Sequence, residues 1–202
     1  MNKTRKVFSV IIACVIMLFA AACSDNTPPF THGTWSNGRT YTSEYLGIRF
    51  ALDITWMPIS DANLAKTAKI VDMSEHRMKT HLDEGGTIYE LIVSRLPDKI
   101  ITITVQDNKK NSSMSEKEFF DSGLVQIKAD KISAGHNCTG GKSSVSFLGK
   151  STDCLKLTAT KDGTTTHHII VPVFKKNYTA CIEFVSQNEN DLNAMVALAS
   201  AI

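Results

Sequence analysis

The sequence predicts an α+β fold in which an antiparallel β-sheet is packed between helices. Strand-like and helix-like segments follow in the order strands, helix, strands, helix, strands, helix. Short turn sequences join neighbouring strands, which favours antiparallel hairpins over parallel crossovers. Residues 39–202 contain no repeat and no second linker, and about 160 residues can bury one real core.

The first predicted elements are a hairpin, a strand and a helix. Asn37-Gly38 tolerates the positive φ angles of a type I′ turn, so residues 34–36 and 39–41 are expected to pair around it. Residues 46–52 alternate apolar and polar side chains with the period of a strand. A helical stretch is expected from Ser60 to Gly85, with an apolar face formed by Leu64, Ala68, Val71 and Met78.

A second hairpin and a second helix come next. Residues 88–95 and 100–106 are rich in β-branched side chains and flank the proline-containing turn 96–99. Ser115 and Glu118 have the spacing of a capping box, which predicts a helix start. The apolar stripe of this helix would comprise Phe120, Leu124 and Ile127.

The last third predicts four consecutive strands and a closing helix. The strands are expected at residues 145–148, 154–160, 165–174 and 178–186. Asp162-Gly163 and residues 175–177 would form the tight turns between the last three. The closing helix begins near Asp191, and its predicted apolar face consists of Leu192, Met195, Val196 and Ala199.

The N-terminus has the pattern of a secretory signal at residues 1–22. Three basic residues precede an apolar run at 7–22, which ends in small alanines directly before Cys23. This run is sixteen residues long, whereas a helix that crosses a bilayer needs roughly twenty. The segment resembles a bacterial lipoprotein signal, which implies cleavage before Cys23 and lipid on its sulfur, with Ala20 where that family usually has leucine. An uncleaved membrane anchor and plain secretory cleavage are the alternatives.

The composition of the mature chain argues against nucleic acid as a partner. Removing Lys3, Arg5 and Lys6 leaves 22 − 3 = 19 basic residues against 20 acidic ones. After the lipidated Cys23, residues 24–38 are polar and contain Pro28-Pro29, so 23–38 are predicted to tether the domain 39–202 to the membrane.

Two segments carry recognisable motifs. Residues 41–50 contain a Gly-Ile-Arg-Phe strand and are followed by Trp56, and residues 178–184 precede the last predicted helix. These segments resemble the opening and closing parts of PsbP-like domains, a family that includes extrinsic photosystem II subunits and a Ran-GTPase-binding protein, although Asp53 stands where proline is common. The resemblance implies an antiparallel sheet between helices and a fold used for binding, and it supplies no catalytic motif.

The three cysteines of the mature domain are expected to be buried free thiols. If Cys154 and Cys181 lie on strands separated by a third, their Cα atoms are about 10 Å apart, too far for a disulfide. A bridge between Cys138 and Cys154 is the alternative.

The most specific catalytic hypothesis is a Cys138 nucleophile activated by His136, two residues away in a glycine-rich loop. The simpler interpretation is a turn that happens to carry both residues. His167 and His168 would point to opposite faces of a strand, and the spacing of His76 and His81 differs from a paired zinc site. The sequence therefore predicts no catalytic residue, no metal and no cofactor.

A cluster of aromatic residues near the start of the domain is an alternative binding surface, for a glycan or peptide. Aromatic side chains in this position more often close the core, and that interpretation is favoured for Trp35, Tyr41, Tyr45 and Trp56.

These observations predict a lipid-anchored, extracytoplasmic protein without enzymatic activity. Its expected role is a binding or assembly module of the cell envelope, with an envelope protein, a peptide or a small ligand as partner. The alternatives are an envelope enzyme that uses a thiol or a metal, with Cys138 and His136 as its residues, and a purely structural envelope protein.

Overall fold

The computed structural model describes residues 30–107, 116–175 and 177–202. The signal segment 1–22, Cys23 and Ser115 of the expected capping box lie outside these residues. Within the described part, no helix has the length and apolar character needed to cross a bilayer. Phe30 is buried in the core, and the first strand begins at Thr34. Residues 30–38 therefore belong to the folded domain and not to the expected tether 23–38.

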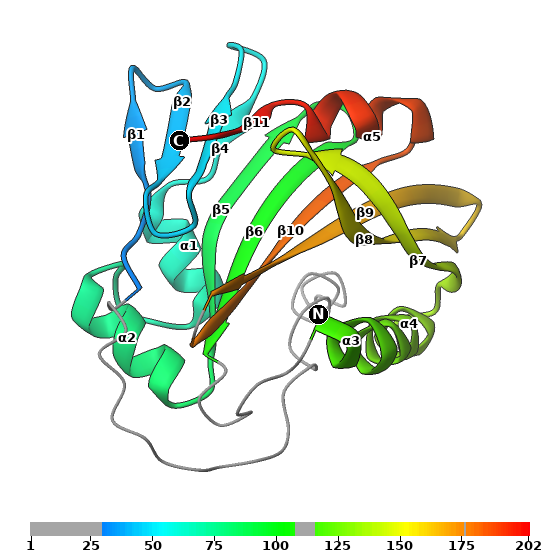
Figure 1. Ribbon diagram of the computed structural model, residues 1–202, viewed down its shortest axis with the longest axis horizontal. Helices are drawn as coiled ribbons and strands as arrows, with labels where there is room; N and C mark the ends of the chain where they lie inside the picture. Colours follow the sequence, from blue (N-terminus) through cyan, green and yellow to red (C-terminus); the bar gives the residue numbers. More distant parts are fainter. Residues whose placement is uncertain (1–29, 108–115, 176) are drawn as a thin grey trace, which may run out of the picture.

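The fold is α+β, as predicted, with two antiparallel sheets (Figure 1). The smaller sheet has the order β1-β2-β3-β11 and the larger one the order β4-β5-β6-β10-β9-β8-β7. The smaller sheet comprises β1 (Thr34–Ser36), β2 (Thr40–Ser43), β3 (Ile48–Ala51) and β11 (Ala199–Ala201). The larger sheet comprises β4 (Met57–Pro58), β5 (Thr87–Arg95), β6 (Lys99–Asp107), β7 (Asn137–Phe147), β8 (Lys150–Lys161), β9 (Thr164–Lys175) and β10 (Tyr178–Ser186).

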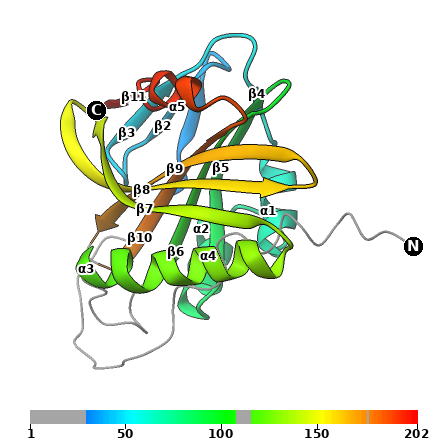
Figure 2. The ribbon, with the colours of Figure 1, turned by 90° about the vertical axis from the view of Figure 1, so that its right-hand side faces the viewer.

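Helices cover both sides of the larger sheet. The helices α1 (Asp61–Ala68) and α2 (Glu75–Asp83) contact β5, and α5 (Glu189–Val196) contacts β9 and β10. The third helical segment consists of α3 (Glu116–Glu118), the π-turn η2 (Phe119–Gly123) and α4 (Leu124–Ser133). Figure 2 shows α4 running alongside β7. The sheet thus separates a large apolar core from a smaller one under η2 and α4.

Several elements differ from the sequence-based prediction. The helix expected from Ser60 to Gly85 is two helices, because Lys69 adopts a left-handed conformation (φ 62°) that ends α1. Val71, expected on the apolar face, is 79% exposed in the connection. Ala199, expected on the closing helix, lies in β11 and pairs with Phe50 of β3.

The glycine-rich segment expected to be a loop is the start of β7. This strand pairs with β8 without interruption from Asn137 to Phe147. A Cβ atom at Gly140 would lie 2.1 Å from the carbonyl oxygen of Lys156, so the glycine permits the close approach of the two backbones. The pairing, rather than the strand propensity of this segment, makes it a strand.

Candidate functional site

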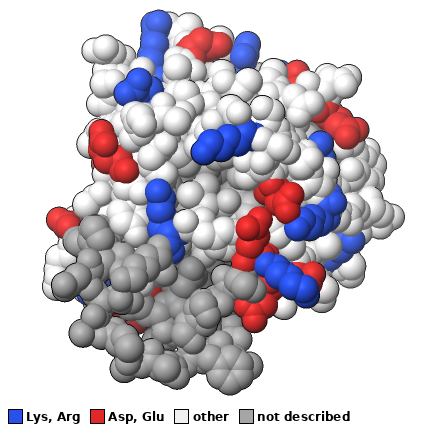
Figure 3. All heavy atoms as spheres, in the orientation of Figure 1, with Lys and Arg blue, Asp and Glu red and all other residues white. Residues whose placement is uncertain are grey.

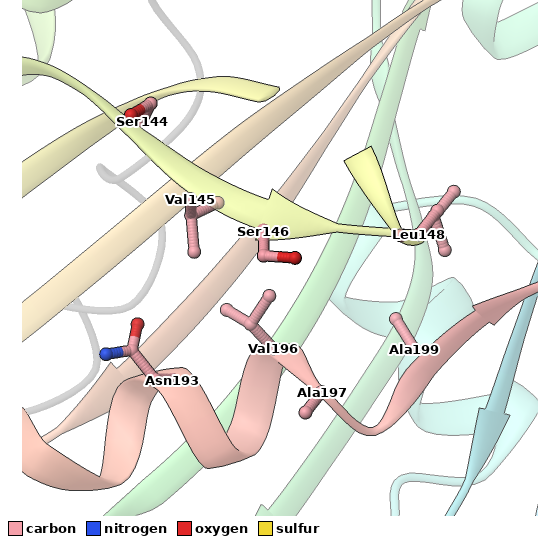
Figure 4. Close-up of a pocket in the computed structure, with 9 residues that line it drawn as sticks. Ser144, Val145, Ser146, Leu148, Asn193, Val196, Ala197 and Ala199 are labelled. Carbon is pink, nitrogen blue, oxygen red and sulfur yellow. The ribbon is translucent and has the colours of Figure 1, made fainter. Parts of the chain in front are cut away.

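An opening lies between the end of β7 and helix α5. Its volume is about 540 Å³, and apolar and small polar side chains line it (Figure 4). Val145 of β7 points toward α5, and Val196 points back from the helix. The remaining lining residues are Ser144, Ser146, Leu148, Gly149, Asn193, Ala197 and Ala199. We call this opening the β7–α5 groove.

None of the described residues that line the β7–α5 groove is charged. Asn193 provides a side-chain amide at its rim and also borders a second cavity of about 90 Å³. That cavity is more polar, because Lys156, His167 and Glu189 contribute to its walls. On the face of the molecule seen in Figure 3, basic and acidic side chains are interspersed and form no extended region of one sign.

A buried ionic network lies between α4 and the larger sheet. Nδ1 of His168 on β9 is 2.8 Å from Oε1 of Glu183 on β10. The other ring nitrogen, Nε2, is 2.9 Å from Oγ1 of Thr166 and 3.5 Å from Nζ of Lys131 on α4. Burial alone would raise the pKa of Glu183, but the hydrogen bond and charge of His168, together with the charge of Lys131, hold this pKa below its ordinary value.

The order hydroxyl, histidine, carboxylate in this network is the order of a catalytic triad, but the surroundings favour a structural role. Both ring nitrogens of His168 have protein partners, so neither faces a substrate. Lys131, His168 and Glu183 are all buried beneath the helix. The network therefore holds α4 against the sheet through charge-assisted hydrogen bonds.

A second buried network attaches the N-terminal segment to the larger sheet. Glu90 lies at a bulge in β5, where the register with β6 shifts. Its carboxylate accepts hydrogen bonds from the Tyr41 hydroxyl and from the backbone N–H of Gly33, at 2.8 Å in the second case. Nδ1 of His32 lies 2.6 Å from the same carboxylate, and Nε2 lies 3.5 Å from Asp61.

Glu90 also determines the titration of its partners. Burial would lower the pKa of His32, but Glu90 and then Asp61 raise it above its ordinary value. Burial and the neighbouring charge of Glu90 raise the pKa of Tyr41. A Cβ atom at Gly33 would lie 2.3 Å from the Tyr41 hydroxyl oxygen, so only glycine fits here without rearrangement.

The structure gives no support to an activated nucleophile at Cys138. His136 lies just before β7, and its Nδ1 atom is buried without a hydrogen-bond partner among the described residues. Burial raises the pKa of Cys138, although Lys131 and Lys128 oppose the effect. An activated cysteine requires a lowered pKa, because the thiolate is the nucleophile.

The three cysteines of the described chain are free, as expected, but only Cys154 is fully buried, whereas Cys138 and Cys181 are partly exposed. Cys154 lies in the large core, whereas Cys138 and Cys181 pack against the smaller one. Burial, followed by the charge of Glu183, raises the pKa of Cys181 to about 12. Cys154 and Cys181 lie on β8 and β10 with β9 between them, as the sequence predicts.

We expect Cys138 to react with iodoacetamide at pH 7.5 at least about tenfold more slowly than a free thiol, because its thiolate fraction is reduced. Intact-mass measurement over time, on a chain without residues 1–22 and with Cys23→Ala, would follow the reaction. In urea all three remaining thiols should react quickly. Rapid labelling of Cys138 in the folded protein would contradict this expectation and would favour the alternative of an envelope enzyme that uses the Cys138 thiol.

His167 and His168 do not contribute to one common site. His167 forms a 3.3 Å contact with the hydroxyl of Thr158, whereas His168 is buried in the network under α4. Within the described ranges, no group of three or more His, Cys, Asp or Glu side chains is placed to hold a metal ion.

The aromatic residues near the start of the domain close the core, as expected. Tyr41 and Trp56 are buried, and Trp35 and Tyr45 pack against the core.

Comparison with known proteins supports the fold. No family model matches the chain, and no curated protein matches it. Among solved structures, the chain is similar to the cyanobacterial PsbP protein CyanoP from Synechocystis sp. PCC 6803, with a TM-score of 0.51 and 9% sequence identity. The similarity covers 90% of this chain and 98% of that one. The fold is therefore PsbP-like, and at this identity the comparison establishes the fold alone.

Proposed function

We propose that this protein is a lipid-anchored binding or assembly module on the extracytoplasmic side of a membrane. The β7–α5 groove is the observation that carries the proposal. It combines an apolar floor with a few polar groups at its rim, as binding sites commonly do. The lipid anchor is proposed from the sequence around Cys23.

Two further observations support binding rather than catalysis. The hydroxyl–histidine–carboxylate arrangement is buried and has protein partners on both ring nitrogens. The pKa of the Cys138 thiol is raised, which disfavours nucleophilic attack. The groove itself is lined by serine hydroxyls, an asparagine amide and apolar groups, which suit recognition better than proton transfer.

The anchor is tested by replacing Cys23 with alanine. In the native host, the wild-type protein should be recovered almost entirely with membranes, and its mature N-terminus should have the mass of a diacylated cysteine. The Cys23→Ala protein should lose this mass and move largely to the soluble fraction or remain unprocessed. An unmodified Cys23 in the native protein would contradict the lipid anchor.

The binding site is tested by photo-crosslinking in intact cells. A photoreactive amino acid at Ala197, on the exposed side of the groove, should give a discrete crosslinked product with a partner. The same amino acid at Lys66, exposed on α1, is the matched control and should not give that product. Equal products at both positions, or none at Ala197, would contradict a role for the groove.

A further inference from the structure

We propose that the β7–α5 groove binds an uncharged, extended segment of a partner protein, which pairs with β7 as an added strand. This inference rests on the proposed function and specifies how the groove would recognise its partner. Strand addition to an exposed sheet edge is a general mode of peptide recognition, in which main-chain hydrogen bonds provide affinity and side-chain pockets provide specificity.

The position of β7 makes strand addition possible. It is the last strand of the larger sheet, and within the described part of the chain it pairs with β8 alone. The opposite edge of the sheet is β4, which has only two residues and ends in Pro58. Short edge strands and proline are common protections against pairing with other chains, so one edge is protected and the other is open.

The β7–β8 turn determines which backbone groups of β7 face outward. Leu148 and Gly149 have φ angles of 50° and 75° and connect Phe147 to Lys150, which face each other across the hairpin. A two-residue turn of this kind joins its flanking residues by hydrogen bonds. Hydrogen-bonded and non-bonded pairs alternate along an antiparallel ladder, so the N–H and C=O groups of Ser144 and Ser146 point away from β8.

These outward groups coincide with the groove. Ser144 and Ser146 are exposed and are both lining residues. A segment that pairs with them would run along β7 and rest on α5. At roughly 3.3 Å per residue, contact with both serines requires a segment of about four or five residues.

The side chains of β7 leave its edge accessible. The strand has no proline, and its register with β8 runs without a bulge. Its single charged residue is Lys142. The Nζ atom of Lys142 lies 2.6 Å from Oδ2 of Asp153 on β8 and 4.6 Å from the ring centre of Phe120, so this side chain is already paired within the domain. The strand therefore lacks the bulges, prolines and free charges that usually discourage edge pairing.

The lining of the groove defines the chemistry of the segment. Among the described lining residues there is no charged group to pair with a charge on the ligand, and burial of an unpaired charge is costly. Val145 and Val196 are buried in the core, so the apolar lining open to one side chain of an added strand is the exposed Ala197 and the half-buried Leu148. The next side chain of that strand would face solvent. The fitting segment is extended, uncharged and apolar at alternate positions.

The test uses a random twelve-residue peptide library displayed on phage, selected against the folded Cys23→Ala protein without residues 1–22. Enriched sequences should be apolar at alternate positions, and a synthetic fluorescent copy should bind in an anisotropy titration. Bound peptide should slow amide hydrogen exchange at Ser144 and Ser146. Failure to enrich a peptide, or protection elsewhere only, would overturn the inference.

Two variants at one position separate backbone pairing from side-chain contact. Ser146→Pro removes an outward N–H, which an edge strand tolerates, and should weaken peptide binding at least about tenfold. Ser146→Ala keeps the N–H and should change affinity by less than about twofold. Equal effects of the two substitutions would contradict strand addition.

A scan of the peptide backbone provides the same information if Ser146→Pro does not fold. N-methylation should abolish binding at alternate peptide positions, whereas uniform tolerance would overturn the inference. Concentration-dependent dimerisation that Ser146→Pro abolishes and that excludes peptide would also overturn it, because the edge would then serve a second copy. A crosslinked partner at Ala197 that is unaffected by Ser146→Pro would preserve the proposed function but reject strand addition.

Discussion

Replacement of Glu90 with alanine is expected to lower the free energy of unfolding by about 3–5 kcal/mol. The carboxylate is fully buried and accepts hydrogen bonds from Tyr41 and Gly33, with His32 as its third partner. Alanine would leave the N–H of Gly33 without this acceptor and would leave the Tyr41 hydroxyl only the main-chain carbonyl of residue 90, at 3.3 Å. It would also remove the side-chain attachment of the N-terminal segment to β5. Urea denaturation followed by circular dichroism measures the effect.

Two other variants make the Glu90 experiment specific. Glu90→Gln keeps an acceptor of similar size but loses the charge, so its cost should be smaller, about 1–2 kcal/mol. Glu44→Ala removes an exposed carboxylate and should change stability by less than about 0.5 kcal/mol. If Glu90→Ala behaves like Glu44→Ala, the network does not stabilise the fold.

Replacement of Glu183 with alanine should be similarly destabilising, by about 3–5 kcal/mol, for a different reason. It would leave the cation of Lys131 and the ring N–H of His168 buried beneath α4 without a carboxylate. Combining Glu183→Ala with Lys131→Met should recover part of the loss, because the unpaired buried charge is then removed. Additive losses in the double variant would contradict coupling through the network.

The same carboxylate predicts a dependence of stability on pH. The pKa of Glu183 is lower in the folded protein than its ordinary value of 4.5, so the folded state favours the charged form. Its contribution is present above pH 4.5 and decreases as the pH falls through the folded pKa. The stability difference between wild type and Glu183→Gln should therefore shrink as the pH falls below 4.5. A difference that grows at low pH would contradict this assignment.

The sequence predicted best those elements that local patterns determine. The strands β8, β9 and β10 combine alternating apolar residues with tight turns, and Asp162 and Gly163 both have the positive φ angles that such a turn needs. The helix prediction after Ser60 was wrong because apolar periodicity alone does not reveal a chain reversal at Lys69. The start of β7 was missed because its strand structure depends on pairing with β8.

The candidate site was less predictable, because it is assembled from distant segments. Glu90 and Glu183 could have been noticed as single charges inside otherwise apolar strands. Their partners could not have been found locally, since His32 is 58 residues from Glu90 and Lys131 is 37 residues from His168. The groove depends on the packing of α5 beside the end of β7, which no pattern in either segment encodes.

The attachment of His32 and Gly33 to Glu90 limits how far the domain can stand from a membrane. Folded structure extends back to the buried Phe30, so only residues 24–29 separate Cys23 from the domain. A fully extended chain spans at most about 3.6 Å per residue, so Cys23 can lie at most roughly 25 Å from Phe30. A lipid on Cys23 would thus hold the protein within about one bilayer thickness of the headgroups.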